Sequence, residues 1–579
     1  MKKAILLFAT AIAMISCQKS AKEAASKNKS FDNYKAGFVE AMWKLSPEYA
    51  SSIGYHKYDS MLTIPDKANR ERQLAFSKAN LDSLKKYDMK NLNATNITDY
   101  RMIENQLQSQ VFGITELKSY EWDPSQYNVC GPFAEILNGN YAPLKERLQN
   151  FSVKMENIQA YYEAAKQQIK NPTLEHTQLA IEQNLGGISV FEKDFIEALK
   201  KADFSPKEVE DMTAKANKAV ASIRDFADFL KNTDNKTPRS FRLGADLYAK
   251  KFEFDIQAGS TADAIYEKAV AHKQELHEKM FALADKLWPK YMENAKKPTN
   301  KLDLIRQVID KISLQHTKPE LFQSEIEKQI PQLIAYIKKK DLIYIDPSKP
   351  LVVRKEPDYM AGVAGASISA PGPYDKNANT YYNVGSLSGW PTEKAESYLR
   401  EYNDYILQIL NMHEAIPGHY TQLVYSNQSP SIIKSVFGNG AMVEGWAVYT
   451  ELMMLESGYA NSDEMWLMYY KWNLRTTCNT ILDNSVHTKD MSKEAALELL
   501  TKEAFQQKAE AEGKWKRVTL TQVQLCSYFT GYSEIYDLRN EIKAKMGKKF
   551  NLKAFHEKFL SYGSAPVKYI RELMLEDLR

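Results

Sequence analysis

The sequence predicts a mainly α-helical protein, a large multi-lobed body with a small β-sheet late in the chain. Over residues 31–342 apolar side chains recur every three or four positions among Lys, Glu, Gln and Ala, which is the period of an amphipathic helix. Between residues 342 and 389 β-branched and aromatic residues mix with Gly and Pro, as in short strands. No Gly/Pro/Ser-rich linker interrupts the interior, so we expect several lobes of one body and not independent domains.

The first residues resemble the signal peptide of a bacterial lipoprotein. Two lysines precede an apolar run that is too short to remain as a membrane span, and residues 14–17 (MISC) resemble a lipobox. Cleavage before Cys17 would leave a lipidated N-terminus; the alternative is an ordinary signal peptide that precedes a cysteine by chance. We expect residues 1–16 to be the signal peptide and residues 17–30 a flexible tether, with the protein in the bacterial cell envelope, facing the periplasm or the cell surface.

Charge and cysteine content narrow the function classes. Removal of the signal peptide takes away two lysines, which leaves 75 basic against 73 acidic side chains and a formal net charge of +2. This balance predicts no nucleic-acid binding, and we expect contact with the membrane only through the lipid anchor. Cys130, Cys478 and Cys526 are too widely spaced for a zinc cluster, so we interpret them as core residues with at most one disulfide.

Residues 413–419 (HEAIPGH) carry the parts of a metal site. Two imidazoles and a carboxylate can hold Zn²⁺ and deprotonate its water, and zinc peptidases of the zincin type use H-E-x-x-H on one helix face. Here the histidines are six residues apart, so an unbroken helix would turn the second about 120° away from the first. Pro-Gly can break the helix, and we therefore interpret His413 and His419 as ligands and Glu414 as the base. The alternative is a helix end with two histidines nearby.

Residues 440–451 (GAMVEGWAVYTE) offer a third ligand. Glu444 lies 25 residues after His419 at the start of an apolar helical run, which suits a second helix packed antiparallel to the first. Glu451 lies seven residues further, close to the same face, where it can accept a hydrogen bond from the far nitrogen of a ligand histidine. The alternative for Glu451 is a solvated charge on the helix surface.

The stretches HEAIPGHYTQ and EGWAVYTE closely resemble signature blocks of the bacterial DUF885 family, a domain of unknown function. The likeness extends almost end to end, over residues 46–59, 242–254, 475–496, 524–539 and 550–566. The resemblance implies a predominantly helical, zincin-like metallopeptidase, related in layout to helical carboxypeptidases and oligopeptidases. One position departs from the family, which usually has two adjacent histidines after Pro-Gly: this chain has His419-Tyr420, and we expect the retained His419 to be the ligand.

Further residues are candidates for the chemistry around the metal. A zinc peptidase needs an electrophile for the developing oxyanion, and the resemblance favours Tyr528 and His487, with His556 as a supporting candidate. Arg475 and Arg539 are candidates for binding a substrate carboxylate, although arginines on helices usually pair with carboxylates of their own protein.

The predicted sheet offers a surface for the substrate. In zincins a small sheet lies above the metal helix near the active-site cleft, and its edge strand aligns a peptide by backbone hydrogen bonds. By analogy, either residues 365–369 or residues 381–384, with Tyr382, would line the groove. We accordingly expect residues 31–342 to form scaffold and cleft wall, and residues 343–579 to form the catalytic region.

The sequence therefore favours a zinc-dependent peptidase of the cell envelope, with a peptide as substrate. Two alternatives remain open: a non-catalytic, helix-rich lipoprotein that binds glycans or peptides for import, and a metal-dependent hydrolase of amides other than peptides. Two histidines and two glutamates within a short span favour an enzyme over a binding protein, because binding alone has no need of them.

Substitution of Cys17 tests the predicted anchor. We expect the Cys17→Ser protein to move from the membrane to the soluble fraction, because the acylated residue is lost. Fractionation of cells expressing each form, followed by immunoblotting, measures this. A mutant that remains with the membranes would place the anchor elsewhere.

Overall fold

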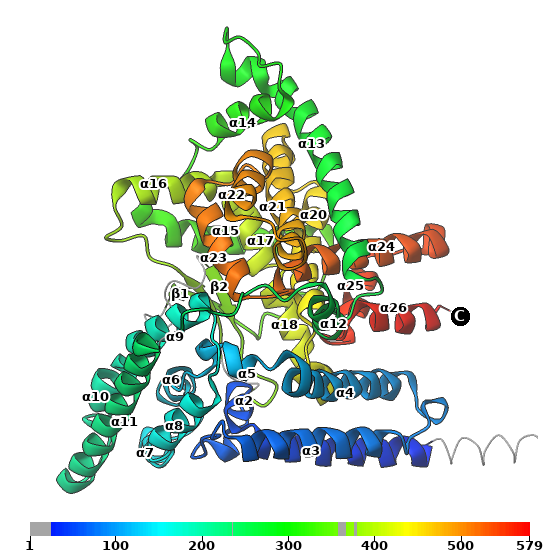
Figure 1. The fold of residues 1–579 in the computed structure, drawn as a ribbon. Coiled ribbons are helices and arrows are strands. Elements are labelled where there is room, and N and C mark those ends of the chain that lie inside the picture. Colours follow the sequence, from blue (N-terminus) through cyan, green and yellow to red (C-terminus); the bar gives the residue numbers. More distant parts are fainter. Residues whose placement is uncertain (1–24, 234, 357–365, 376–378, 579) are drawn as a thin grey trace, which may run out of the picture.

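A computed structural model describes residues 25–233, 235–356, 366–375 and 379–578 (Figure 1). The protein is mainly helical with one small three-stranded sheet, as predicted. Its buried apolar side chains form two separate cores: the larger draws on residues 31–122 and 243–574, and the smaller on residues 127–230. The HEAIPGH and GAMVEGWAVYTE segments both belong to the larger core.

The N-terminal helices form the base of the molecule in the view of Figure 1, where α3 and α4 lie side by side. Both helices begin at a side-chain cap, since Asp66 accepts a hydrogen bond from the Asn69 amide and Asn93 from the Asn96 amide. The first described helix covers residues 25–45 and so includes residues 25–30, which we expected in the tether. It is followed by α2 (Pro47–Ser52), α3 (Lys67–Leu84), α4 (Ala94–Phe112) and α5 (Ser119–Trp122).

The smaller core is enclosed by helices of the next hundred residues, at the lower left of Figure 1. Aromatic rings fill it, with the centroid of Phe151 4.7 Å from that of Phe133 and 4.3 Å from that of Phe195. The helices are α6 (Cys130–Asn138), α7 (Leu144–Met155), α8 (Ile158–Gln168), α9 (Leu174–Gly187), α10 (Phe195–Leu199) and α11 (Pro206–Asn232).

The chain then returns to the larger core through a long helix. α13 packs along α21 and against α14, and rises with α14 to the top of the molecule in Figure 1. The helices of this section are α12 (Ala245–Ile256), α13 (Ala262–Met292), α14 (Lys301–Ile312) and α15 (Phe322–Lys340).

The sheet follows, within the stretch where the sequence predicts strands. β3 (Thr380–Val384) is the central strand and pairs with β1 (Leu351–Lys355) in parallel and with β2 (Ala366–Ser369) in antiparallel direction. Because β3 is bonded on both sides, β2 and β1 are the edges, and β2 is the edge that contacts the helix carrying His413. Of the two segments that the sequence proposes for the groove, residues 366–369 therefore form an edge of the sheet and residues 381–384 form its centre.

The remaining helices form the centre of the larger core. α20 is apolar on nearly every side and buried from residue 445 to residue 455, as expected for a helix enclosed by others. The helices are α16 (Thr392–Glu401), α17 (Asp404–Glu414), α18 (His419–Asn427), α19 (Ile432–Val436), α20 (Gly440–Glu456), α21 (Asp463–Thr488), α22 (Lys493–Glu498), α23 (Lys508–Leu520), α24 (Ser527–Met546), α25 (Leu552–Ser561) and α26 (Val567–Glu576).

Two glycines bring α20 and α24 into direct backbone contact. A Cβ atom on Gly445 would lie 2.2 Å from the carbonyl carbon of Gly531, and one on Gly531 would lie 1.7 Å from the carbonyl oxygen of Ala441. No larger residue fits at either position without moving a helix. This close crossing sets the position of Glu444, next to Gly445, relative to the start of α24.

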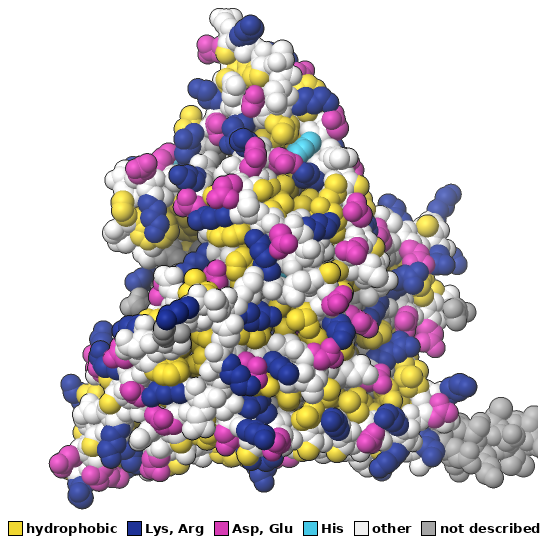
Figure 2. Space-filling view, in the orientation of Figure 1, with side chains coloured by type: hydrophobic (Ala, Val, Ile, Leu, Met, Phe, Trp, Pro, Cys, Tyr) yellow, Lys and Arg dark blue, Asp and Glu magenta, His cyan; other side chains and the backbone are white. Residues whose placement is uncertain are grey.

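The exterior agrees with the charge balance of the sequence. Figure 2 shows basic and acidic side chains interspersed over the face in view. No helix in the part of the chain that the structure describes is long and apolar enough to cross a membrane. The predicted lipidation site Cys17 and the predicted signal peptide lie outside that part. Cys130, Cys478 and Cys526 are buried and free, without the one disulfide that the sequence allowed.

Replacing Gly445 tests the helix crossing. We expect Gly445→Ala to lower the free energy of unfolding by about 1–3 kcal/mol, because the added methyl group meets backbone atoms that cannot turn away. Gly513→Ala is the matched control: a Cβ at Gly513, within α23, has nothing within 4 Å, and the substitution should be neutral or stabilising by up to about 1 kcal/mol. Urea unfolding followed by tryptophan fluorescence measures both, and equal effects of the two substitutions would contradict the crossing.

Candidate metal centre

The helix carrying His413 breaks before His419. α17 ends at Glu414, and α18 begins at His419. Ala415 leaves the helical region with φ −106° and ψ −89°, and the Pro417 carbonyl accepts a hydrogen bond from Trp446 Nε1 at 2.9 Å. The two histidines therefore stand on different helices, which removes the angular mismatch of a continuous helix.

Gly418 is required at this break because the chain folds back on itself. A Cβ atom there would lie 1.8 Å from the carbonyl oxygen of His413 and 2.4 Å from that of Met412. Any side chain at this position would overlap these two carbonyl oxygens, so the close backbone contact requires glycine. The absent side chain allows α18 to start against the last turn of α17.

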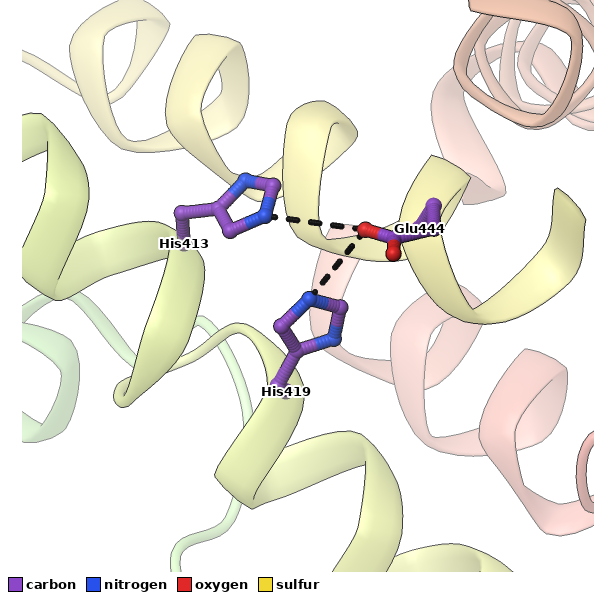
Figure 3. A group of neighbouring side chains, drawn as sticks. All are labelled: His413, His419 and Glu444. Carbon is purple, nitrogen blue, oxygen red and sulfur yellow. Dashed lines mark ion pairs between the residues drawn. The ribbon is translucent and has the colours of Figure 1, made fainter. Parts of the chain in front are cut away.

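His413, His419 and Glu444 converge on one point (Figure 3). Glu444 Oε2 lies 3.3 Å from His419 Nε2 and 3.8 Å from His413 Nε2, and the ligand atoms of the three residues all lie within 4.8 Å of one another. The two imidazole rings are nearly perpendicular, at 87°. Ligand atoms around a tetrahedral zinc ion, at bond lengths of about 2.0–2.1 Å, are about 3.3 Å apart. The separation between Glu444 and His419 equals this value, and the separation between Glu444 and His413 is longer, at 3.8 Å.

Glu451 holds the far side of His413. Its Oε1 accepts hydrogen bonds from His413 Nδ1 at 2.7 Å and from Trp472 Nε1 at 3.1 Å, and its side chain is fully buried. A proton on Nδ1 leaves the lone pair of Nε2 directed toward Glu444, so this carboxylate selects the tautomer that a metal ligand requires.

The charges of the cluster favour the binding of a cation. Burial opposes protonation of His413, but the carboxylates of Glu444 and Glu451 outweigh it and raise its pKa to about 10. Burial disfavours the charge of Glu444, but the two imidazoles lower its pKa overall. Glu444 Oε2 and His419 Nδ1 are buried without a hydrogen-bond partner in the described chain. An oxygen so placed between two imidazoles fits the donor set of a zinc ion.

Glu414 and Tyr528 lie beside the three ligands. Burial raises the pKa of Glu414, as does Glu444, while the two imidazoles lower it. The Tyr528 ring lies 6.5 Å from that of His413 at an interplanar angle of 20°. Burial and the charge of Glu444 raise the pKa of Tyr528 to about 12, so its hydroxyl remains a proton donor at neutral pH.

Tyr382 connects the sheet to α17, the helix that carries His413. It is fully buried on β3, and its hydroxyl donates to Asn411 Oδ1 at 2.9 Å. Asn411 is two residues before His413 on α17. Tyr382 therefore positions the sheet over the site, and as a side chain with no exposed surface it does not line a groove.

Four other candidate residues have partners within the fold. His487 is buried, and its Nε2 lies 3.0 Å from the Val518 carbonyl and 3.1 Å from the Thr521 carbonyl, near the end of α21 opposite to the site. It lies 15 residues after Trp472 on this helix, about 22 Å along its axis. The structure does not bring His487 to the three ligands. The others are His556, between Tyr449 and the Leu342 carbonyl, Arg475, paired with Glu510, and Arg539, paired with Glu456.

Tyr420, at the position where the family usually has a second histidine, faces away from the cluster. It is buried, and its hydroxyl donates to the Lys349 carbonyl. Of the two adjacent positions, the structure therefore directs His419 toward Glu444 and uses Tyr420 to hold the segment before β1.

Comparison with known proteins places the chain in a family. Residues 47–574 match the model of a family described as a bacterial protein of unknown function, DUF885. The chain belongs to this family. A solved structure of a "putative lipoprotein of unknown function" from Shewanella oneidensis has 55% sequence identity, covers 94% of this chain and 99% of its own, and has a TM-score of 0.85.

A more distant structure shares the fold. A "putative lipoprotein" from Colwellia psychrerythraea has 15% identity, covers 95% of this chain and 99% of its own, and has a TM-score of 0.78. No curated protein matches the chain. The family match confirms the DUF885 resemblance inferred from the sequence, and the fold is shared by a protein with little sequence identity.

Sequence reasoning missed three side chains near the site of this DUF885 protein. Trp472 bonds to Glu451, Arg517 donates from Nη2 to the Tyr528 hydroxyl at 3.0 Å, and Lys514 is buried one turn before Arg517. The first lies just upstream of a segment that resembles the family, which is a weak signal. The other two lie in a charged helix that resembles a solvated surface helix.

Removing the break should remove the metal. We expect the double substitution Pro417→Ala and Gly418→Ala to lose zinc, because two helix formers favour a continuous helix and the Cβ at 418 meets the His413 carbonyl. Tyr420→Phe is the control next to the ligand and should keep zinc, since it loses only a hydroxyl that contacts Lys349. Metal content of the purified proteins measures this. Zinc retained by the first and lost by the second would contradict both the break and the assignment of His419.

Proposed function

We propose that this DUF885 protein is a zinc-dependent peptidase. The observation that carries the proposal is the convergence of the His413 and His419 imidazoles on Glu444 Oε2, a buried oxygen that has no hydrogen-bond partner in the described chain. Glu451 fixes the tautomer of His413. These three residues would hold the ion. A zinc ion with three protein ligands supplies a Lewis acid that activates water for attack on a carbonyl carbon.

Glu414 is proposed as the general base. It directly follows His413 and lies close enough to both imidazoles for their charges to lower its pKa, against a burial that raises it. A carboxylate with a raised pKa can take a proton from the attacking water and return it to the leaving amine as the C–N bond breaks. The products are then a carboxylate and an amine, with the elements of one water molecule added.

Tyr528 is proposed to stabilise the oxyanion. Its hydroxyl is a donor near the metal ligands, and Arg517 donates to that hydroxyl from the other side. A donor positioned in advance for the developing negative charge stabilises the transition state more than the ground state. The sequence left Tyr528 and His487 as equal candidates, and the positions of the two side chains favour Tyr528.

β2 is proposed to align the substrate. It is a sheet edge beside α17, so one row of its backbone groups is available to an extended peptide. Of the two segments considered from the sequence, residues 366–369 form this edge, whereas residues 381–384 are bonded on both sides. The lipobox-like start and the lipoprotein descriptions of the two similar structures support a place in the cell envelope, held by lipid at Cys17.

Metal content and cleavage of a peptide library test the proposal together. We expect about one zinc per chain, lost in His413→Ala and Glu444→Ala, and peptide cleavage that Glu414→Gln reduces about 10²–10⁴-fold without loss of zinc. Tyr528→Phe should lower kcat about 10²–10³-fold. Tyr532→Phe, one turn further along α24, is its control and should have little effect. A zinc-loaded protein that cleaves no member of the library would contradict the proposal.

A further inference from the structure

One face of α23 lies next to the elements of the metal centre. Glu510, Lys514 and Arg517 are three or four residues apart on this helix and so share a face. That face meets α21 through the ion pair between Glu510 and Arg475, and α24 through the hydrogen bond from Arg517 to Tyr528. The charge of Arg475 also reaches the site, where it lowers the pKa of the general base.

The charges around this face do not balance. Lys471 pairs with Glu401 at 2.7 Å, with both side chains almost fully buried, and Arg475 pairs with Glu510 through Nε at 3.1 Å and through Nη2. Each carboxylate therefore has its own cation. Two further cations, on α23, have no carboxylate within 4.0 Å in the described ranges.

Lys514 is the first of these cations. The residue is only 4% exposed, and its ammonium makes no hydrogen bond to any residue that the structure describes. Burial and the neighbouring Arg475 lower its pKa well below the usual range, which Glu510 and Glu401 only partly offset. The side chain is buried while the ammonium nitrogen keeps some accessible surface, so a bound anion can reach it and would supply the missing charged partner.

Arg517 is the second cation, and it is the closer of the two to the chemistry. It donates to two neutral acceptors, Gln524 Oε1 at 2.7 Å and the Tyr528 hydroxyl at 3.0 Å. A guanidinium has five N–H donors, so this arrangement leaves donors for a ligand. The two arginines that the sequence analysis favoured for a carboxylate, Arg475 and Arg539, already have carboxylate partners.

We propose that Lys514 and Arg517 bind the free carboxylate at the C-terminus of a peptide, so that the enzyme removes residues from that end. The inference rests on the peptidase function proposed above. Arg517 is one hydrogen bond from Tyr528, the proposed oxyanion donor, and an extended residue spans about 3.5 Å. A carboxylate held by Arg517 therefore belongs to the first or second residue after the scissile bond, and cleavage releases an amino acid or a dipeptide.

The test measures binding apart from cleavage. One peptide, labelled at its N-terminus with a fluorophore, is made as the free acid, as the C-terminal amide, and as the amide with glutamate as its last residue. Fluorescence anisotropy with the Glu414→Gln protein measures the affinity of each. We expect the free acid to bind about tenfold or more tightly than either amide, because only it carries a terminal carboxylate for the two cations.

Variants of α23 locate the site. In the Glu414→Gln background, Lys514→Met should bring the acid-to-amide ratio of affinities close to one, and Lys514→Arg should restore it. Lys516→Met is the matched control on the same helix, because Lys516 points to Glu182 at 3.2 Å, and it should leave the ratio unchanged. Circular dichroism of each variant shows that the fold is retained.

The outcomes separate this inference from the proposed function. Equal affinity for the acid and the amide overturns the inference, whatever the activity of the parent protein. Tight binding of the glutamate amide would assign the two cations to acidic side chains and also overturns it. A preference for the free acid in a protein that cleaves no peptide would contradict the peptidase function and leave the carboxylate site standing.

Discussion

The hydrogen bond between Glu451 and His413 is the interaction on which the candidate site depends. Glu451 is fully buried, and a buried carboxylate that loses its donors costs several kcal/mol. Its two donors come from α17 and α21, so the bond joins three helices of the core. Glu444 and Glu451 are two turns apart on α20 and face the same way. The helix α20 therefore contacts both nitrogens of His413: Glu451 bonds to Nδ1, and Glu444 lies near Nε2.

Two steric constraints complete this arrangement. The missing side chain of Gly418 allows the chain to fold back against α17, which brings His419 to the position that an unbroken helix would deny it. The contact between Gly445 and Gly531 allows α24 to approach α20, which brings Tyr528 beside the ligands. In both places the chemistry of a polar side chain depends on a neighbouring residue with no side chain.

Sequence spacing predicts part of this candidate site. Counting along helices predicts that residues 413, 419, 444 and 451 lie together, because the direction of a side chain follows helical rotation once the break at Pro-Gly is recognised. The small sheet was found because β-branched and aromatic residues differ clearly from the helical pattern around them. Each of these features is encoded by residues that are close together in the sequence, so a local pattern is enough to predict it.

Other features depend on contacts between distant segments, and no local pattern contains them. Gly445 and Gly531 are 86 residues apart, and each alone resembles an ordinary helix glycine. His487 and Tyr528 both lie in stretches that resemble the family, and only their surroundings distinguish a side chain held by backbone carbonyls from one beside the metal ligands. Lys514 resembles a solvated lysine until α23 is packed.

The charges of the candidate site and of α23 differ in sign, and this difference would orient a bound peptide. An acidic group lies around the imidazoles and consists of Glu414, Glu444 and Glu451. A basic group on α23 consists of Lys514 and Arg517, and Arg517 donates a hydrogen bond to Tyr528 beside the imidazoles. A zinc ion would neutralise part of the acidic group, while the two cations would remain without an anion. Nearby charges of opposite sign orient a dipolar ligand, and the main chain of a free peptide has its negative charge at the C-terminus and its positive charge at the N-terminus. Such a peptide would approach with its C-terminus toward α23, which places a bond near that end at the metal.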